Sequence, residues 1–400
     1  MRDFIQDAPD TYAAEPIPDE AKTAIDALLS SGDLFRYTSE RAPVALLEEE
    51  FAQLLGSKYA LAVSSCSAAL FLSLKALDLP KGARVLIPAF TFAAVPSAVV
   101  HAECQPVLVE VDATYRIDLQ DFEAKIADCD AVLISHMRGH TSDMDAIKAL
   151  AFVYDVPVIE DAAHSLGTTW NGQNIGTLGH VGCFSFQSYK MINAGEGGIM
   201  VSDDPELIAR AVIMSGAYEH NWKKHAIVGE IAARWQNRLP LYNLRMQNLS
   251  ACVIRPQLGE LERRVRDGRA NHDYVAAKLL ASDMFEVPAP LAPELRAPDS
   301  LQFNLRGFTD AQAEAFMAAT TRRGVGTQVF GLSQDNARAF WNWQFIPGEL
   351  PELPKTRAML ARACDTRLPA RLTQSELDFI ADAIIDAGHE VRGTDGAPNQ

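Results

Sequence analysis

Short apolar runs dominate the first half of the chain, and a helix-like segment follows most of them. The runs are YALAVSS (59–65), ARVLIPAF (83–90), PVLVEVD (106–112), DAVLISH (130–136) and VPVIEDAA (156–163). They lack polar–apolar alternation, which is typical of strands buried on both faces of a mostly parallel sheet. Ligands of such sheets bind at the carboxyl ends of the strands. Functional residues are therefore expected in the segments that directly follow these runs.

The character of the sequence changes after about Ser250. Long charged helices are predicted first, then a Pro-rich loop at 287–298, a strand–helix–strand pattern and a last helix at Ser375–Val391. A chain of 400 residues is long enough for two domains. The predicted division is an N-terminal arm (1–15), a large cofactor-binding domain (16–250), a smaller C-terminal α+β domain (251–392) and a tail (393–400).

Composition argues against several classes of function. The formal net charge of −16 disfavours a nucleic-acid-binding surface, although a basic pocket can coexist with an acidic exterior. The six cysteines show no metal-site spacing, so no metal site is predicted. The N-terminus is acidic and has no apolar core, and no apolar run is long enough for a membrane helix. These features predict a cytoplasmic protein.

The strongest chemical signal lies in VIEDAAHSLG (158–167) and GCFSFQSYKMINAGEGG (182–198). Asp161 ends one apolar strand, and Lys190 follows another strand that carries Ser185. Pyridoxal phosphate (PLP) requires a lysine, a carboxylate for its ring nitrogen, and hydroxyl and amide groups for its phosphate. This arrangement favours a PLP site. Two simpler interpretations stay open at this point: Asp161 as a helix N-cap, and the glycine-rich segment as a tight turn.

These two segments resemble the DegT/StrS-type sugar aminotransferases, and the resemblance extends from about Ile17 to the last helix. It implies the PLP-dependent transferase fold type I, a homodimer with shared active sites, and amino transfer from L-glutamate to an oxo-sugar. EDAAHSLG is similar to the family strand that places Asp161 at the pyridine nitrogen and His164 near the ring oxygen. SFQSYK is similar to the family's Ser-Phe-His-x-x-Lys, which implies Ser185 at the phosphate and Lys190 as the Schiff-base lysine.

Further motifs extend the resemblance, with some departures. VSSCSAAL (63–70) is similar to the family's phosphate loop, with Ser67 in place of Thr and Cys66 in place of Gly. PAFTF implies that Phe92 stacks on the cofactor ring, whereas an isolated Phe would be interpreted as core packing. HMRG (136–139) is similar to a family His-x-x-Gly. LYNLRM implies that Asn243 reaches the phosphate of the partner subunit's cofactor.

Lys190 also bears on the reaction, because relatives with His at this position catalyse dehydration. Three segments resemble the branch that aminates 8-oxo-3,8-dideoxy-octulosonate: FRYTSER (35–41), SHMRGHTSDMDAI (135–147) and VFGLSQDNARAFWNWQFI (329–346). The WNW triplet within the last of them is expected to form a buried aromatic cluster of the small domain. Two alternatives remain: an aminotransferase or dehydratase of a non-sugar ketone such as a cyclitol, and a catalytically silent PLP-binding regulator.

Overall fold

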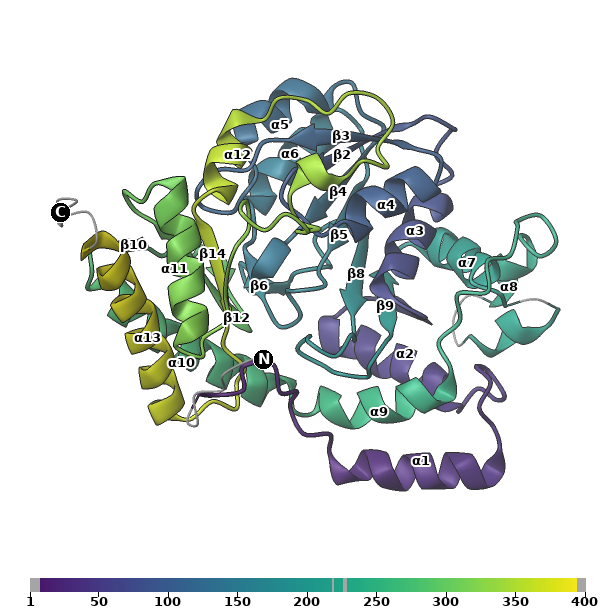
Figure 1. The fold of residues 1–400 in the computed structure, drawn as a ribbon. Coiled ribbons are helices and arrows are strands. Elements are labelled where there is room, and N and C mark those ends of the chain that lie inside the picture. The colour runs from purple at the N-terminus through teal and green to yellow at the C-terminus, as the bar shows by residue number, and fades with distance from the viewer. Residues whose placement is uncertain (1–7, 218, 226–228, 394–400) are drawn as a thin grey trace.

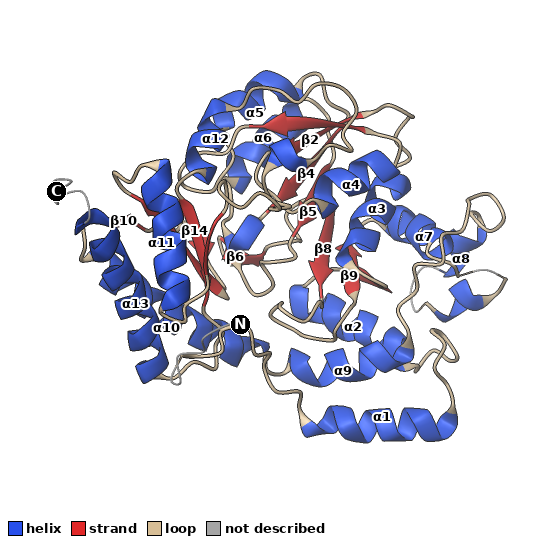
Figure 2. Cartoon of the chain, viewed as in Figure 1, coloured by secondary structure: helices blue, strands red, loops and turns tan. Residues whose placement is uncertain are grey.

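The computed structural model describes residues 8–217, 219–225 and 229–393. A seven-stranded sheet lies at the centre of its larger part, flanked by helices (Figure 1, Figure 2). In spatial order its strands are β1 (Tyr59–Val63), β9 (Gly198–Ser202), β8 (Val181–Ser185), β5 (Val158–Asp161), β4 (Ala131–Ser135), β2 (Arg84–Pro88) and β3 (Gln105–Val109). All pairings from β8 to β3 are parallel, and β9 is antiparallel to both of its neighbours. The predicted mostly parallel sheet is confirmed.

The helices around this sheet begin and end where local sequence signals place them. α2 starts with Pro43 in its first turn and stops at Gly56, whose φ of 74° is left-handed. β4 and β8 are buried along their whole length, in keeping with their unbroken apolar sequences. The helices of this part are α1 (Asp19–Ser31), α2 (Pro43–Leu55), α3 (Cys66–Ala76), α4 (Ala94–His101), α5 (Leu119–Ile126), η1 (Met137–Gly139), α6 (Met144–Val153), α7 (Pro205–Met214), η2 (Asn221–Lys224), α8 (Gly229–Ala233) and α9 (Asn248–Leu258).

A second, smaller sheet lies beside the first part and carries its own apolar core. Its strands, in spatial order, are β10 (Phe285–Glu286), β12 (Ser300–Leu305), β14 (Ala363–Arg367) and β13 (Thr327–Val329). The C-terminal helices are α10 (Leu261–Leu280), α11 (Asp310–Arg322), η3 (Phe340–Asn342), α12 (Pro354–Leu360) and α13 (Gln374–Gly393). Phe285, Phe303 and Phe316 pack together in this core, and α11 lies against α13.

The segment between β13 and β14 returns to the larger part of the molecule. Figure 1 shows this yellow-green stretch arching over β2 and β3. Phe330, Phe340 and Trp343 are buried in the larger core, and Trp341 is only partly buried against it. The expectation that WNW forms an aromatic cluster of the small domain is therefore wrong, because this segment packs across the large sheet instead.

The part of the N-terminal arm that the structure describes, residues 8–15, is docked on the protein. Arg371 Nε donates to the carbonyl of Ala13 at 3.1 Å, and Glu15 pairs with Arg263 at 3.3 Å. Residues 1–7 of the predicted arm and residues 394–400 of the predicted tail lie outside the described residues. Within the described ranges, no helix combines the length and apolar character that a bilayer span requires.

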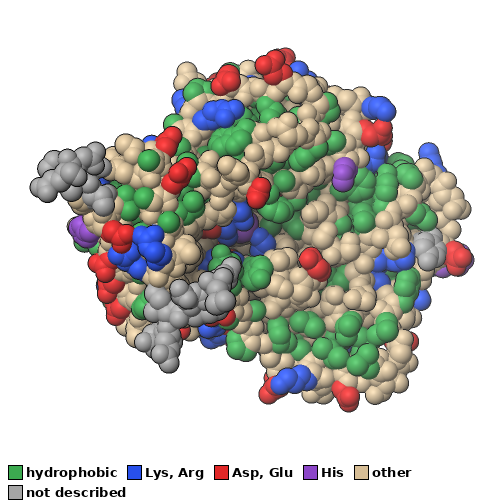
Figure 3. Space-filling view, in the orientation of Figure 1, with side chains coloured by type: hydrophobic (Ala, Val, Ile, Leu, Met, Phe, Trp, Pro, Cys, Tyr) green, Lys and Arg blue, Asp and Glu red, His purple; other side chains and the backbone are tan. Residues whose placement is uncertain are grey.

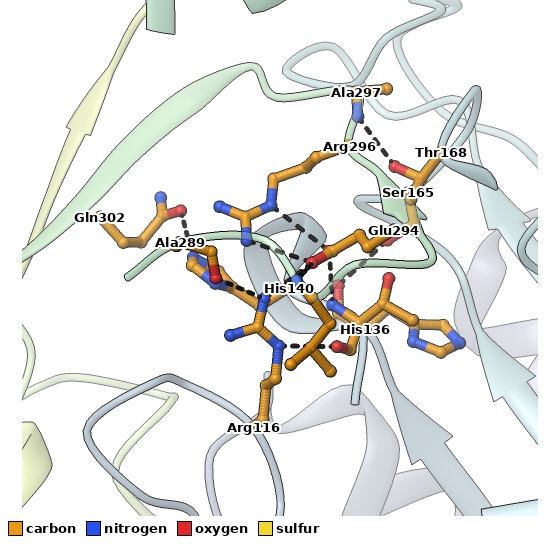
Figure 4. A network of polar contacts seen from close by, with 12 residues as sticks. Arg116, His136, His140, Ser165, Thr168, Ala289, Glu294, Arg296, Ala297 and Gln302 are labelled. Atoms are coloured by element: carbon orange, nitrogen blue, oxygen red, sulfur yellow. Dashed lines mark hydrogen bonds and ion pairs between the residues drawn. The ribbon is translucent and has the colours of Figure 1, made fainter. Parts of the chain in front are cut away.

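A buried charge network joins the two parts of the molecule (Figure 4). Glu294 lies in β11 (Glu294–Leu295), which pairs with β6 (Thr169–Trp170), itself paired with β7 (Gln173–Asn174). Its carboxylate binds Arg116 at 2.7 Å, Arg296 at 3.4 Å and the amide of Thr141 at 2.9 Å. Burial alone would raise the pKa of Glu294, but the charges of Arg296 and Arg116 hold it below its ordinary value. The small sheet is reached through His140, whose Nε2 lies 3.0 Å from Oε1 of Gln302 in β12, so the segment that follows β4 contacts both β11 and the small sheet.

Candidate active site

A cavity of about 640 Å³ lies where the carboxyl ends of the central strands face the small sheet. On the face shown in Figure 3, basic and histidine side chains gather in the central hollow. Seven of the eight predicted site residues line the cavity: Cys66, Ser67, Phe92, Asp161, His164, Ser185 and Lys190. A second cavity, of about 760 Å³, lies near the amino ends of β5 and β8 and contains none of them. The strand-end rule therefore located the cavity correctly.

Hydroxyl groups from neighbouring strand ends hold the carboxylate of Asp161. Ser135, at the end of β4, donates to Asp161 Oδ2 at 2.7 Å, and Thr91 donates to Ser135 Oγ at 2.8 Å. The amide of Ala163 donates to Asp161 Oδ1 at 3.1 Å. Only turns lie between Asp161 and β6 (Thr169–Trp170), so the interpretation of Asp161 as a helix N-cap is wrong, and its carboxylate instead lines the cavity. One oriented carboxylate, only 7% exposed, is available to a group in the cavity.

The amine of Lys190 lies beside His164, with 2.8 Å between Lys190 Nζ and His164 Nε2. Burial lowers the pKa of Lys190 to about 8. Burial first, and then the charge of Lys190, lowers the pKa of His164 well below its ordinary value. His164 is consequently neutral at physiological pH and accepts a hydrogen bond from the protonated lysine. A smaller fraction of Lys190 is protonated than of an exposed lysine, which favours its use as a nucleophile.

The start of α3 forms the opposite wall of the cavity. Ser65 caps this helix, because its hydroxyl oxygen accepts from the amide of Ala68 at 3.1 Å. The amides of Cys66 and Ser67, in the first turn of the helix, are then left to face a ligand. The Cys66 thiol lies 3.9 Å from Asp161 Oδ1, and burial, followed by the Asp161 charge, raises the pKa of this thiol well above its ordinary value. Cys66 therefore stays a neutral thiol and does not compete with Asp161 for positive charge.

The glycine-rich segment after Lys190 has a steric role at this wall. A Cβ on Gly198 would lie 2.2 Å from the carbonyl carbon of Ser65 and 2.4 Å from the amide nitrogen of Cys66. β9 can therefore run directly beneath the start of α3 only because residue 198 has no side chain. Gly195 adopts a left-handed φ of 75° and completes the turn. The segment is a tight turn and also permits the close approach of backbone that builds the cavity.

Phe92 and Asn243 differ in their relation to the cavity. Phe92 is 46% exposed and lines the cavity, so the core-packing interpretation does not hold for this side chain. Asn243 is exposed, with a left-handed φ of 40°, and it is not among the lining residues of its own chain. Its segment runs beside the end of β1, where the amide of Ser64 donates to the carbonyl of Leu244 at 2.9 Å.

Sequence reasoning missed several residues of the cavity. Arg138, Arg338 and Arg367 all line it, and Tyr12 comes from the docked N-terminal segment. Arg138 is left-handed, with a φ of 56°, and forms a 2.5 Å ion pair with Asp365 in β14. A single arginine in a polar loop carries no signal of function, because most arginines are exposed. Arg138 alone had a local marker, since it lies inside the HMRG motif noted in the sequence.

One of the three motifs that suggested a substrate branch, FRYTSER (35–41), is structural in this chain. Arg36 of FRYTSER is buried and donates to the carbonyl of Ala62 at 3.1 Å and to Ser215 Oγ at 2.8 Å. Tyr37 is also buried, and its hydroxyl donates to Glu48 at 2.8 Å. Neither residue lines the cavity of its own chain. The structure therefore gives this motif a role in holding the end of β1 and not in contacting a substrate within the chain.

The central sheet, the smaller second sheet and the cavity between them define a fold type I PLP-dependent aminotransferase. Over residues 17–385 the sequence matches the DegT/DnrJ/EryC1/StrS aminotransferase family. The chain belongs to this family, which confirms the resemblance found in its motifs and its class as a transaminase.

Individual relatives agree with this assignment. 3-Amino-5-hydroxybenzoic acid (AHBA) synthase superposes with a TM-score of 0.84 at 25% identity, over 96% of this chain and 100% of that one. The spore coat polysaccharide biosynthesis protein SpsC of Bacillus subtilis is 28% identical over 395 residues, which cover 96% of this chain and 97% of SpsC. The uncharacterized protein MJ1066 of Methanocaldococcus jannaschii is 39% identical over 186 residues, which cover 46% of this chain and 48% of that protein.

The protonation of Lys190 offers a test of the site's electrostatics. Because burial lowers the pKa of Lys190 to about 8, its labelling by an amine-reactive reagent should rise through about pH 8 in the cofactor-free protein. Lys81 is 81% exposed and paired with Glu103, which raises its pKa, so it should label only at clearly higher pH. Peptide mass spectrometry across the pH series measures both residues. Parallel labelling curves for the two lysines would contradict this picture of the site.

Proposed function

We propose that this aminotransferase takes its amino group from L-glutamate and transfers it to a keto or aldehyde group of a sugar. The acceptor would be a nucleotide-linked sugar or a keto-sugar acid, in amino-sugar or surface-polysaccharide biosynthesis. The observation that carries the proposal is the pairing of a buried amine, Lys190, with an oriented carboxylate, Asp161, in one cavity. The name of SpsC, which refers to spore coat polysaccharide biosynthesis, supports the assignment to sugars. Location in the cytoplasm remains part of the proposal.

The residues present fit PLP as the cofactor. Lys190 would attach it, Asp161 would keep its ring nitrogen protonated, and His164 would lie near the ring oxygen. Phe92 offers an exposed aromatic face to the ring, while Ser67, Ser185 and the first amides of α3 are suited to its phosphate. Cys66 contributes its amide here, although a glycine is usual at this place in the family. When bound, PLP supplies an electron sink for the bond-breaking step.

The chain's own groups account for the proton movements. The neutral amine of Lys190 can take up a proton from a substrate carbon and return it at a neighbouring atom. His164, at 2.8 Å, orients that amine and remains uncharged because of its burial. Hydrogen bonds from the hydroxyl of Ser135 and the amide of Ala163 hold the carboxylate of Asp161 in place, so its charge faces the cavity during the reaction. A lysine that can move protons in this way favours amino transfer over dehydration.

Two alternatives remain distinguishable by experiment. AHBA synthase, a relative of similar fold, is named for an aromatic acid and not for a sugar, so a non-sugar ketone such as a cyclitol is a second class of acceptor. A catalytically silent PLP-binding regulator would retain the cofactor without turning over an amino donor. The contact between Lys190 and His164, with Asp161 lining the same cavity, argues against that possibility.

The glutamate half-reaction tests the proposal without knowledge of the acceptor. L-Glutamate should convert bound PLP to pyridoxamine phosphate (PMP), seen as the loss of the visible absorbance band of the PLP form. Asp161→Asn should slow this conversion by about 100-fold or more, because the ring loses the charge that makes it an electron sink. Lys190→Ala should lack the visible band of the wild type. A wild-type protein that binds PLP but converts none of it with any amino donor would favour the regulator.

We also propose a homodimer in which Asn243 completes the partner subunit's site. Its exposure, its left-handed backbone and its position outside its own cavity support this arrangement. A twofold dimer has one interface, to which both subunits contribute the same patch, and therefore two equivalent sites. The proposal implies that neither subunit holds a complete active site alone.

Mixed dimers test this sharing of residues. Subunits carrying Lys190→Ala should be inactive alone, and subunits carrying Asn243→Ala should be strongly impaired. Random mixing makes about half of the dimers heterodimers, each with one intact site, so about one quarter of wild-type activity should return. Turnover after mixing under exchange conditions measures this recovery. Activity no greater than the sum of the two separate variants, or a fully active monomer in light scattering, would show that Asn243 serves no partner site.

A further inference from the structure

One guanidinium in the active-site cavity has no carboxylate partner. Within the described residues, no carboxylate oxygen lies within 4.0 Å of the guanidinium nitrogens of Arg338. Arg338 Nε is buried and donates no hydrogen bond to any described group. The side chain nevertheless lines the cavity, together with Phe92, Asp161 and Lys190. The side chain is only partly buried, and its guanidinium, which no carboxylate neutralises, faces the cavity and is available to an anionic ligand.

The neighbouring cations, in contrast, already have partners. Arg138 is paired with Asp365 at 2.5 Å, and Asp365 also accepts from Gln302 at 2.6 Å. Arg367 donates to the carbonyl of Tyr189 at 3.2 Å through both terminal nitrogens and lies 4.0 Å from Asp299. The carboxylates on this side of the cavity are therefore committed to other groups. Arg338 is left as the cation that can receive an anion from solution.

The chain holds Arg338 firmly in this position. The backbone of Ala339 pairs with that of Phe90, which places Arg338 beside the end of β2 and the Phe92 ring. Its guanidinium carbon lies 5.8 Å from the centre of the Phe92 ring and 5.7 Å from that of Phe330. Stacking on aromatic faces orients the planar group while leaving its edge free for hydrogen bonds.

Two further contacts fix the loop that carries this arginine. Asn336 is buried, accepts from the amide of Arg338 at 2.9 Å and donates to the carbonyl of Phe330 at 2.5 Å. The buried indole of Trp343 donates to the carbonyl of Ala337 at 2.9 Å. Such preorganisation lowers the entropic cost of binding a ligand. The structure thus gives Trp343 of the WNW triplet a function as a support for the loop.

We propose that Arg338 binds a carboxylate of the substrate and so makes the enzyme selective for acidic substrates. The inference rests on the proposed amino transfer, since it assigns a residue to recognition within the same site. A guanidinium presents two parallel N–H groups that match a carboxylate edge to edge. Burial, and then the charge of Arg138, lowers the pKa of Arg338 to about 10, so it remains charged at neutral pH. A single unpaired guanidinium matches one carboxylate better than a diphosphate, which carries more charge than one cation neutralises.

The first experiment measures binding of a simple dicarboxylate. Glutarate affinity of the PLP-loaded protein is measured by titration calorimetry for wild type, Arg338→Gln and Arg338→Lys. The Gln variant should bind glutarate about 10- to 100-fold more weakly, the range expected for a charge-assisted hydrogen bond. The Lys variant retains the charge without the planar fork and should fall between the two. Arg357→Gln is the matched control, because Arg357 also lies over two aromatic rings, Phe340 and Trp341, but outside the cavity.

A second pair of measurements identifies the source of the carboxylate. The donor is tested by the dependence of PLP-to-PMP conversion on L-glutamate concentration. The acceptor is tested by return of the PMP form with D-glucuronate and with D-glucose, two sugar aldehydes with and without a carboxylate. If Arg338→Gln slows only the conversion of PLP to PMP by L-glutamate, Arg338 binds the donor. If the variant also slows the return of the PMP form with D-glucuronate but not with D-glucose, Arg338 binds an acidic acceptor as well. Both outcomes support a carboxylate receptor.

Other outcomes overturn the inference. UDP is titrated beside glutarate, L-glutamate and D-glucuronate, and weaker binding of UDP alone in Arg338→Gln would assign the residue to a phosphate. If Arg338→Gln has the same thermal midpoint as the wild type and binds all of these probes with unchanged affinity, Arg338 has no role in anion recognition. If wild type converts no PLP with any donor, the proposed function fails, whereas the glutarate titration still decides the role of Arg338.

Discussion

The hydrogen bond from Ser135 to Asp161 is the interaction on which the site depends. It joins the ends of adjacent parallel strands, β4 and β5, whose register places these two residues opposite each other. Thr91, which follows β2, supports Ser135 from the next strand. The carboxylate is therefore oriented by the order of strands in the sheet and not by a flexible loop. Lys190, which follows β8 on the other side of β5, then completes the pair of groups that a PLP enzyme requires.

Much of this arrangement was predictable, because burial leaves a direct mark on the sequence. Strands covered on both faces are mostly apolar and lack polar–apolar alternation, which made VIED and VGCFS recognisable as strands. The strand-end rule then located Asp161 and Ser185. The steric role of Gly198 was only partly visible, since its neighbour, the backbone of Ser65, lies far away in the sequence. The division into domains at Ser250 remains a prediction.

The arginines of the cavity could not be predicted from the sequence, and the reason is physical. Arg138, Arg338 and Arg367 lie on separate segments and meet only after the 330–363 stretch packs back over the large sheet. No periodicity or spacing records that long-range contact. The result is a locally basic cavity in a chain whose formal net charge is −16. Such a contrast attracts small anions to the site while the exterior stays acidic.

The central claim is that Lys190 is the residue to which PLP attaches. Reduction of the PLP-loaded protein with borohydride fixes the cofactor to its lysine, and proteolysis followed by mass spectrometry identifies the modified peptide. The account predicts that the phosphopyridoxyl group will be found on Lys190, and that Lys190→Ala will carry none. Stoichiometric modification of a different lysine in the wild-type protein, with Lys190 unmodified, would contradict the account.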